Sequence, residues 1–360
     1  MKIPFKALTL VLATVFAPLI SQPAQAQTTS NLSAIVEAWL ASPHAATESE
    51  SFRHWDKDGA VPGVCATCHT ASGYRDFLAS DGKTPGVIDH PALPRATVDC
   101  ATCHSPAAEV LASVTFPSGV TVDSMGASSR CAVCHQGRES TVKVASTLAG
   151  LEEDTPSADL AFINVHYRAA AATLMGSVVK GAFEYDGQTY QGQFTHVPNV
   201  DSCVTCHEPH ALVVKAETCS TCHAGVEMSA IRTSKTDHDG DGDVVEGIAA
   251  EIDGLHQMLG QAMQAYATDA GAPIVYGPGA YPYFFNDSNG NGTADPGEAI
   301  YPNRYQAWTP RLLKAAYNYQ FVAVDPGAYA HNPHYVIQVL YDSLASLAEK
   351  TTVDLTKINR

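Results

Sequence analysis

The chain has 360 residues, of which 45% are hydrophobic, so it can form one large packed domain or two ordinary ones. Acidic residues outnumber basic ones, 37 Asp and Glu against 21 Lys and Arg, and the formal net charge is −16. A nucleic-acid backbone would be repelled by this charge, so nucleic acid is excluded as a favoured partner.

The first 26 residues have the organisation of a signal peptide. Lys2 and Lys6 form a basic start, residues 7–20 are largely apolar, and Ala24-Gln25-Ala26 fits a cleavage site made of small residues. The apolar stretch is too short for a membrane anchor, and no later apolar stretch is long enough to cross a bilayer. We therefore expect an exported protein without a membrane span, in the periplasm or outside the cell.

Residues 27–60 are predicted to form two short helical pieces that carry His44 and His54. Five copies of the motif Cys-x-x-Cys-His follow. They are Cys65-Cys68-His69, Cys100-Cys103-His104, Cys131-Cys134-His135, Cys203-Cys206-His207 and Cys219-Cys222-His223, called motifs 1 to 5 below. All ten cysteines belong to these motifs, and this is the attachment pattern of c-type haem.

The chemistry of haem attachment explains the motif. Two thiols add to the two haem vinyl groups as thioethers, and the next residue places an imidazole under the iron as the proximal ligand. Disulfides, zinc sites and redox dithiols also use cysteine pairs, but none of them needs a histidine after every pair. We therefore predict five haem c groups. The motifs are so closely spaced that we expect the haems to pack against one another, those of motifs 4 and 5 most closely.

Ten further histidines supply candidates for the second ligand of each iron. His210 lies three residues after motif 4, on a tether too short to reach the far face of its own haem. His166 begins a helix-like stretch, and His196 follows a predicted β-hairpin at residues 183–190. The six favoured candidates are His44, His54, His166, His196, His210 and His331. Six candidates for five irons favour two histidine ligands on every iron.

Two acidic loops are predicted to bind one or two calcium ions. Residues 287–298 match the EF-hand loop pattern throughout, with oxygen ligands from Asp287, Asn289, Asn291, Thr293, Asp295 and Glu298. Residues 237–248 match only in the first half, through Asp237, Asp239 and Asp241. The twelfth position there is Ile248, so either Glu246 or Glu251 would have to supply the missing carboxylate.

Residues 227–360 contain no cysteine and are predicted to form a helical subdomain. One helical face is formed by Val244, Ile248, Ile252, Leu255, Leu259 and Met263. Further helices are expected to begin after Thr309-Pro310 and at Asn332-Pro333, where His331 directly precedes the predicted N-cap. The expected fold is mainly α with much irregular coil, organised around stacked haems, with one small β-hairpin. Its expected parts are a signal peptide (1–26), a pentahaem region (27–226) and a helical C-terminal subdomain (227–360).

With these motifs the chain resembles the multihaem c-type cytochromes, including the cytochrome c3/c7-like and doubled-CxxCH groups. The sequence CxxCHEPH at 203–210 is similar to their common arrangement, which implies that His210 binds a neighbouring haem. The segments SPHA, FRHWD, FINVHY, DGDGD and WTPRLLKAAYNYQ are similar to exported multihaem cytochromes of respiratory bacteria. The resemblance implies electron transfer outside the cytoplasm, as in anaerobic respiration.

The favoured hypothesis is electron transfer through five mostly bis-histidine haems, with redox proteins or the next cytochrome of a chain as partners. Two alternatives stay open. One is a haem reductase or oxidase of a small nitrogen or sulfur compound, which would need one iron with an open face. The other is a subunit of a cytochrome filament, in which the partner is a homopolymer of this chain.

Overall fold

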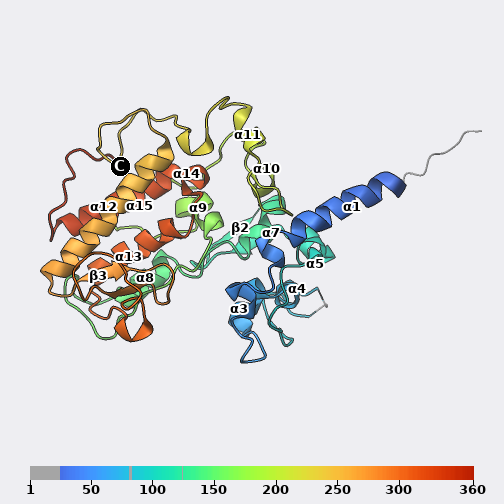
Figure 1. Ribbon diagram of the computed structural model, residues 1–360, viewed down its shortest axis with the longest axis horizontal. Coiled ribbons are helices and arrows are strands. Elements are labelled where there is room, and N and C mark those ends of the chain that lie inside the picture. The colour runs from blue at the N-terminus through green and yellow to red at the C-terminus, as the bar shows by residue number, and fades with distance from the viewer. Residues whose placement is uncertain (1–24, 81–82, 124) are drawn as a thin grey trace, which may run out of the picture.

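The computed structural model describes residues 25–80, 83–123 and 125–360. The predicted signal peptide, residues 1–26, lies almost wholly outside these residues. The fold is mainly helical with long irregular connections, as predicted. Figure 1 shows the long C-terminal helices gathered at one end of the molecule and short N-terminal helices at the other. Within the described ranges, no helix combines the length and apolar character needed to cross a membrane.

The N-terminal part consists of short helices joined by turns. Helix α1 (Gln25–Leu40) projects from the body in Figure 1. The elements that follow are η1 (Pro43–Ala45), α2 (Glu50–Arg53), α3 (Gly63–His69), α4 (Ala71–Phe77), α5 (Cys100–His104), α6 (Pro106–Glu109), η2 (Gly126–Ser128) and α7 (Ser129–Ala132). Side-chain caps fix where these helices start. The Thr70 hydroxyl accepts from the Gly73 amide at α4, and Asp99 and Thr102 form a capping box at α5.

Two small antiparallel sheets, each of two strands, replace the single predicted hairpin. Strand β1 (Ser113–Thr115) pairs with β2 (Thr121–Asp123), and β3 (Ile274–Tyr276) pairs with β4 (Phe284–Asn286). The hairpin predicted at residues 183–190 was wrong: the segment turns at Gly187 but forms no strands.

The reason lies in side chains from distant parts of the chain. The Phe183 amide donates to Asn318 Oδ1 at 2.7 Å, and the Glu184 amide donates to Thr141 Oγ1 at 3.0 Å. These long-range bonds use the N–H groups that a strand ladder would need.

The later elements are α8 (Thr141–Leu148), α9 (Ala170–Met175), η3 (Gly176–Val178), α10 (Cys203–Cys206), α11 (Ala216–Ser220), η4 (Met228–Ala230), α12 (Ile248–Asp269), η5 (Tyr301–Asn303), α13 (Pro310–Ala323), α14 (Ala328–His331) and α15 (Pro333–Ala348). The predicted caps are confirmed, because Thr309 accepts from the Leu312 amide and Asn332 from the Tyr335 amide. Helix α12 buries Ile252, Leu255, Leu259 and Met263 as expected. Val244 does not belong to this face, since it precedes the helix and is exposed.

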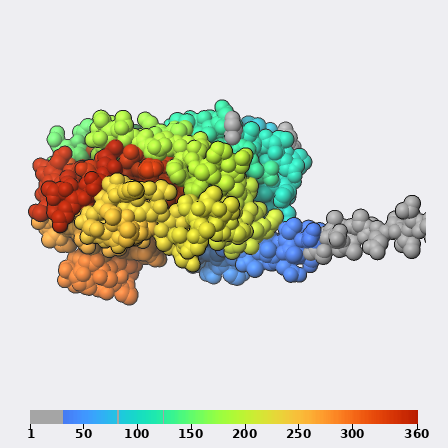
Figure 2. Space-filling view, turned by 90° about the horizontal axis from the view of Figure 1, so that it is seen from above, coloured from blue at the N-terminus to red at the C-terminus, as the bar shows by residue number. Residues whose placement is uncertain are grey.

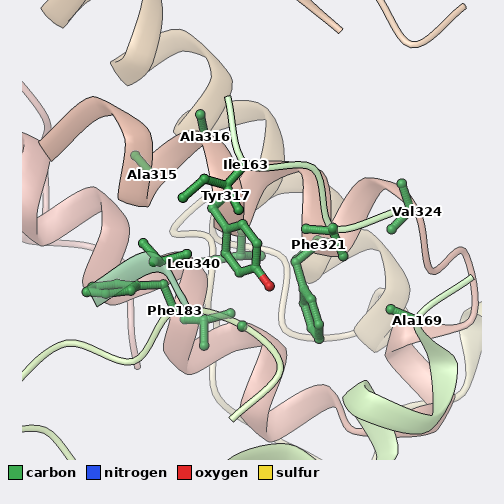
Figure 3. Close-up of a cluster of buried hydrophobic side chains, with 14 of the residues drawn as sticks. Ile163, Ala169, Phe183, Ala315, Ala316, Tyr317, Phe321, Val324 and Leu340 are labelled. Atoms are coloured by element: carbon green, nitrogen blue, oxygen red, sulfur yellow. The ribbon is translucent and has the colours of Figure 1, made fainter. Parts of the chain in front are cut away.

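The main core lies between α12, α13 and α15 and extends to the segment before motif 4. Figure 3 shows Tyr317 and Phe321 of α13 among Leu340 of α15 and the side chains of Ile163 and Phe183. The Tyr317 hydroxyl donates to the Gly181 carbonyl at 2.8 Å, so the one polar atom of this buried ring is satisfied. Residues 141–183 are thus held against the C-terminal helices by both apolar contact and hydrogen bonds.

Residues 197–230, which we call the double-motif segment, have a different character. They carry motifs 4 and 5 on the short helices α10 and α11, and none of them is buried. Figure 2 shows this yellow-green segment at the surface between the N-terminal elements and α12. An extended segment of this kind lacks the apolar burial that normally orders a chain.

Candidate haem-binding site

Each cysteine pair begins in a short helix, and its second cysteine lies in that helix or two residues after its end. Motifs 1, 2 and 4 are in α3, α5 and α10, and motifs 3 and 5 begin in α7 and α11. The i, i+3 spacing places both thiols of a pair on the same helix face, as two thioether bonds to one porphyrin edge require. All ten cysteines are described, and none of them forms a disulfide.

Motif 3 touches three of the other motifs. The thiols of Cys68 and Cys134 interact, and each lies 3.8 Å from a backbone oxygen of the other motif. The Cys131 thiol interacts with that of Cys203. Arg130 links motif 3 to motif 2 by donating to the Cys103 carbonyl at 3.2 Å.

Motif 4 in turn contacts motif 5, where the Thr218 hydroxyl donates to the Thr205 carbonyl at 3.3 Å. The thiol contacts therefore join motif 3 to motifs 1 and 4, rather than joining the two motifs nearest in sequence.

Each motif histidine faces the ring of one predicted distal histidine. The ring centroids are 5.7 Å apart for His69 and His166, 6.3 Å for His104 and His210, 6.4 Å for His135 and His44, 6.3 Å for His207 and His331, and 6.2 Å for His223 and His196. The two members of a pair can lie far apart in the sequence, as His207 and His331 do. The structure thus arranges ten of the fifteen histidines as five pairs.

These separations fit an iron with an imidazole on each side. An imidazole nitrogen binds a transition metal at about 2 Å, so two such bonds plus the two ring radii place the ring centroids about 6 Å apart. In the pair of His69 and His166 the two Nε2 atoms face one another at 3.4 Å. The residues present therefore fit haem iron as the bound group.

Hydrogen bonds at Nδ1 leave Nε2 of several rings available as the ligand atom. His69 Nδ1 pairs with the Ser51 carbonyl at 2.7 Å, and His135 Nδ1 pairs with the Arg168 carbonyl at 3.1 Å. His210 pairs instead with Glu208, and His331 with Asp325. Bonds of this type fix the tautomer and the orientation of a ligand histidine.

For two of the distal candidates, burial also favours the neutral imidazole. Burial, followed by the neighbouring His135, lowers the pKa of His44 to about 4. Burial and the neighbouring His69 lower the pKa of His166 to about 4. His166 also has a backbone φ of 67°, a conformation that non-glycine residues adopt uncommonly and that occurs often at functional sites.

His54, the sixth predicted candidate, is not paired with a motif histidine. Its ring packs on Trp55, and its Nδ1 pairs with Glu50 at 2.9 Å. Trp55 in turn contacts the ring of His69, so His54 lies behind an aromatic side chain rather than opposite a motif. Two histidines outside the candidate set support the fold, because His256 stacks on Tyr319 and His238 bonds to the Asn359 carbonyl.

The loop of residues 287–298 adopts a wrapped conformation. Asp287 accepts from the amides of Gly290 and Gly292, both at 2.8 Å. Glu298 Oε1 accepts from the Ser288 amide at 2.7 Å, which brings the last residue of the loop back to the first. Asp287 and Glu298 are both buried. The loop thus directs its acidic side chains inward, as the EF-hand pattern requires.

The acidic loop that begins at Asp237 has the same pattern of amide hydrogen bonds, except that its last carboxylate comes from helix α12. Asp237 accepts from the amides of Gly240 and Gly242, at 2.6 and 2.9 Å. Glu251, from the first turn of α12, accepts from the amides of His238 and Asp239, at 2.6 and 2.9 Å. Glu251 therefore occupies the position that Glu298 has in the other loop, although it lies beyond the twelve-residue pattern.

Glu246 adds a further acidic group to the same place. Carboxylate oxygens of Asp239, Asp241 and Glu246 lie within 4.8 Å of one another, as do those of Asp237, Asp239 and Glu251. Burial and then repulsion from Asp239 and Asp241 raise the pKa of Glu246 to about 7. A bound cation would relieve this repulsion.

One residue with a place in these sites, Asp325, could not be found from sequence patterns, whereas Glu251 was one of two alternatives for the missing carboxylate. Glu251 lies outside the motif window, and its only signal is an acidic residue one turn after a defective loop. Asp325 precedes His331 by six residues, and no motif relates the two. Hydrogen bonds across the fold favour Glu251 as the carboxylate that holds the start of the loop, and they show the contact between Asp325 and His331.

Cysteine pairs followed by histidines, with a second histidine facing each of them, are the features of a multihaem c-type cytochrome. Comparison with known proteins agrees. The chain is similar to the C-type polyheme cytochrome OmcB of Geobacter sulfurreducens. The two are 25% identical over an alignment of 368 positions, which covers 83% of this chain and 46% of that protein.

It is also similar to the C-type polyheme cytochrome OmcC of the same species. These two are 27% identical over an alignment of 362 positions, which covers 81% of this chain and 43% of that protein. The chain therefore spans less than half the length of these relatives. No family profile and no solved structure matches it. Over most of its length the chain is thus similar to multihaem c-type cytochromes.

Proposed function

We propose that the protein transfers electrons outside the cytoplasm through five haem c groups, each with two histidine ligands. The proposed ligand pairs are His69 with His166, His104 with His210, His135 with His44, His207 with His331, and His223 with His196. Bound haem would supply reversible one-electron oxidation and reduction of its iron. The chain would hold each haem by two cysteines and two imidazoles.

The observation that carries the proposal is the one-to-one pairing of histidines. Each of the five motif histidines has a facing partner, and no partner is shared. An enzyme of this class would need an iron with an exchangeable coordination position. Because the five pairs would use all five irons, the pairing supports an electron carrier over a reductase or an oxidase.

The contacts among motifs support a particular order of haems. Motif 3 lies against motifs 1, 2 and 4, and motif 4 lies against motif 5. We propose that the haem of motif 3 is the junction of the array, with motifs 1, 2 and 5 at its ends. The net charge of −16 favours redox partners with a basic docking surface.

We also propose that each acidic loop binds one calcium ion. Asp287, Asn289, Asn291, Thr293, Asp295 and Glu298 would form the first site, and Asp237, Asp239 and Asp241 with Glu251 the second. The support is the shared pattern of amide hydrogen bonds in the two loops, in which Glu251 corresponds to Glu298. Their role would be structural, because Glu251 joins the second loop to the first turn of α12, and Gln264 of α12 donates to the Gly292 carbonyl of the first loop at 2.9 Å.

The ligand pairs are tested by substitution of single distal histidines. His44→Ala, His166→Ala, His196→Ala, His210→Ala and His331→Ala should each convert one low-spin haem to high spin in the electronic spectrum of the oxidised protein. His54→Ala is the matched control, and it should leave all haems low-spin. A high-spin haem in the His54→Ala protein, or none in the other variants, would refute the assignment.

A further inference from the structure

One of the paired histidines bonds to a buried carboxylate. His331 Nδ1 lies 2.9 Å from both carboxylate oxygens of Asp325, whose side chain is only 3% exposed. The corresponding bonds of His69 and His135 go to neutral backbone carbonyls. His210 also meets a carboxylate, that of Glu208, but this side chain is 37% exposed and therefore faces solvent.

The surrounding chain fixes both members of the Asp325–His331 pair. Asp325 follows the end of α13, and its carboxylate also accepts from the Gly327 amide at 3.2 Å and interacts with the Thr173 hydroxyl. His331 ends α14, where its amide donates to the Gly327 carbonyl at 2.9 Å. A side chain at Gly327 would come within 2.7 Å of His331 Cε1, so the ring packs directly on the backbone.

Among the described residues, no Lys or Arg forms an ion pair with this carboxylate. Within the described ranges, the one ion pair of Asp325 is with His331 itself. By contrast, the buried carboxylate of Asp342 is paired with the guanidinium of Arg360 at 2.9 Å. The negative charge of Asp325 therefore acts mainly on the His331 imidazole, and through it on a metal bound at Nε2.

The effect of such a carboxylate on a ligand histidine follows from elementary electrostatics. A carboxylate that accepts the Nδ1–H bond increases the basicity of Nε2, and so its donation to a metal. A buried negative charge near the iron also stabilises the ferric state over the ferrous state, because little solvent screens it. Both effects favour oxidation and lower the reduction potential.

We propose that Asp325 is a positioning residue that, through His331, makes the haem of motif 4 the most strongly reducing of the five. This inference rests on the proposed function, since it requires His331 to be the distal ligand opposite His207. Motif 4 lies between motif 3 and motif 5 in the order proposed above. Asp325 would thus set the energy of the step by which electrons reach the haem of motif 5.

The test is a spectroelectrochemical titration of the haem-loaded Asp325→Asn protein. The substitution keeps the shape of the side chain and removes its charge. One of the five components should shift upward, with its reduction equilibrium changed about tenfold or more, which is about 59 mV for a one-electron couple. The other four components should move much less. No shift, or an equal shift of all five, would overturn the proposal.

Two controls separate charge at His331 from general effects of substitution. Asp342→Asn removes a buried carboxylate of α15 that touches no ligand histidine, and it should leave all five potentials unchanged. Glu208→Gln removes the exposed carboxylate beside His210, and its shift should be smaller than that of Asp325→Asn. Shifts of equal size in these three variants would contradict a specific role for Asp325.

A second variant tests the proposal even if the Asp325→Asn protein does not fold. His331→Met replaces the ligand by a thioether, which raises the potential of a c-type haem. The component that moves should be the lowest of the wild-type protein, and the movement of a higher component would overturn the proposal. Low-spin signals from five haems in the wild-type protein establish the ligation separately, so failure of the proposed function is distinguishable from failure of this inference.

Discussion

The double-motif segment and helix α13 represent two ways of ordering a polypeptide. Eleven of the fourteen residues of α13 are buried, and its side chains interlock with α12 and α15. The double-motif segment has 34 residues by its bounds, 197–230, and buries none of them. Its two motifs contribute four cysteines and two histidines, and no apolar residue of the segment is buried. In our account, covalently bound haem supplies the apolar surface that α13 obtains from its neighbours.

The largest effect should come from preventing haem attachment. We expect a variant with all ten cysteines replaced by alanine to lose order in the double-motif segment but to keep its C-terminal helices. Hydrogen exchange should show amides of α13 and α15 protected roughly a thousandfold more than those of residues 203–223. In the haem-loaded protein this contrast should shrink. Equal protection of both regions in the cysteine-free variant would contradict the comparison.

A substitution in the helical core should affect stability and leave the haems intact. Leu340 of α15 is completely buried, and Leu340→Ala should lower the free energy of unfolding by about 2–5 kcal/mol. Val142→Ala, at a half-exposed residue of α8, is the matched control and should cost less than about 0.5 kcal/mol. Thermal melting measures both changes. A changed haem spectrum in Leu340→Ala would show that the two regions are less independent than we infer.

Removal of calcium should have a smaller effect, limited to the acidic loops beside α12. At a calcium concentration a hundredfold above the Kd, each site contributes about 2.7 kcal/mol of stability. Chelation should therefore lower the Tm, and Glu298→Gln should remove the part of this shift that belongs to its loop. Glu152→Gln, at an exposed carboxylate elsewhere, serves as the control. An unchanged Tm on chelation would remove the calcium proposal.

The smallest effect concerns a buried carboxylate of the N-terminal part. Asp76 accepts from the amides of Asp89 and His90, at 2.6 and 2.8 Å. Burial raises its pKa, but the hydrogen bonds from His90 and Asp89 outweigh this and hold the pKa below the ordinary value of 3.8. Its stabilising contribution is present above pH 3.8 and is lost as the pH falls through the lower folded value.

The Asp76→Asn variant checks that direction. It should have a lower Tm than the wild-type protein at pH 7, and the difference should disappear in strong acid. A difference that grows as the pH falls would contradict the assignment.

Local features of the sequence predicted local features of the structure. The caps Thr309 and Asn332 mark where α13 and α15 begin, and the apolar face of α12 is buried as its periodicity indicates. The predicted hairpin at 183–190 failed because Asn318 and Thr141, far away in the sequence, bind its backbone amides. Turn chemistry alone contains no information about such partners.

The same distinction applies to the candidate site. Spacing alone identified the motif cysteines and histidines, and five of the six distal candidates face a motif histidine in the fold. Which histidine faces which motif could not be predicted, because the pairs join residues as distant as 207 and 331. Asp325 was missed, and the choice between Glu246 and Glu251 stayed open, for the same reason: each acts on a partner that the chain reaches only after folding.

The most direct test of the account is low-temperature electron paramagnetic resonance of the oxidised, haem-loaded protein, integrated against its haem content. The proposed ligand pairs predict low-spin signals alone, with a total of five ferric haems. A high-spin signal equivalent to one haem would mean that one iron lacks its second histidine. That result would contradict the five pairs and direct attention to nitrite, hydroxylamine and tetrathionate as substrates of an open haem.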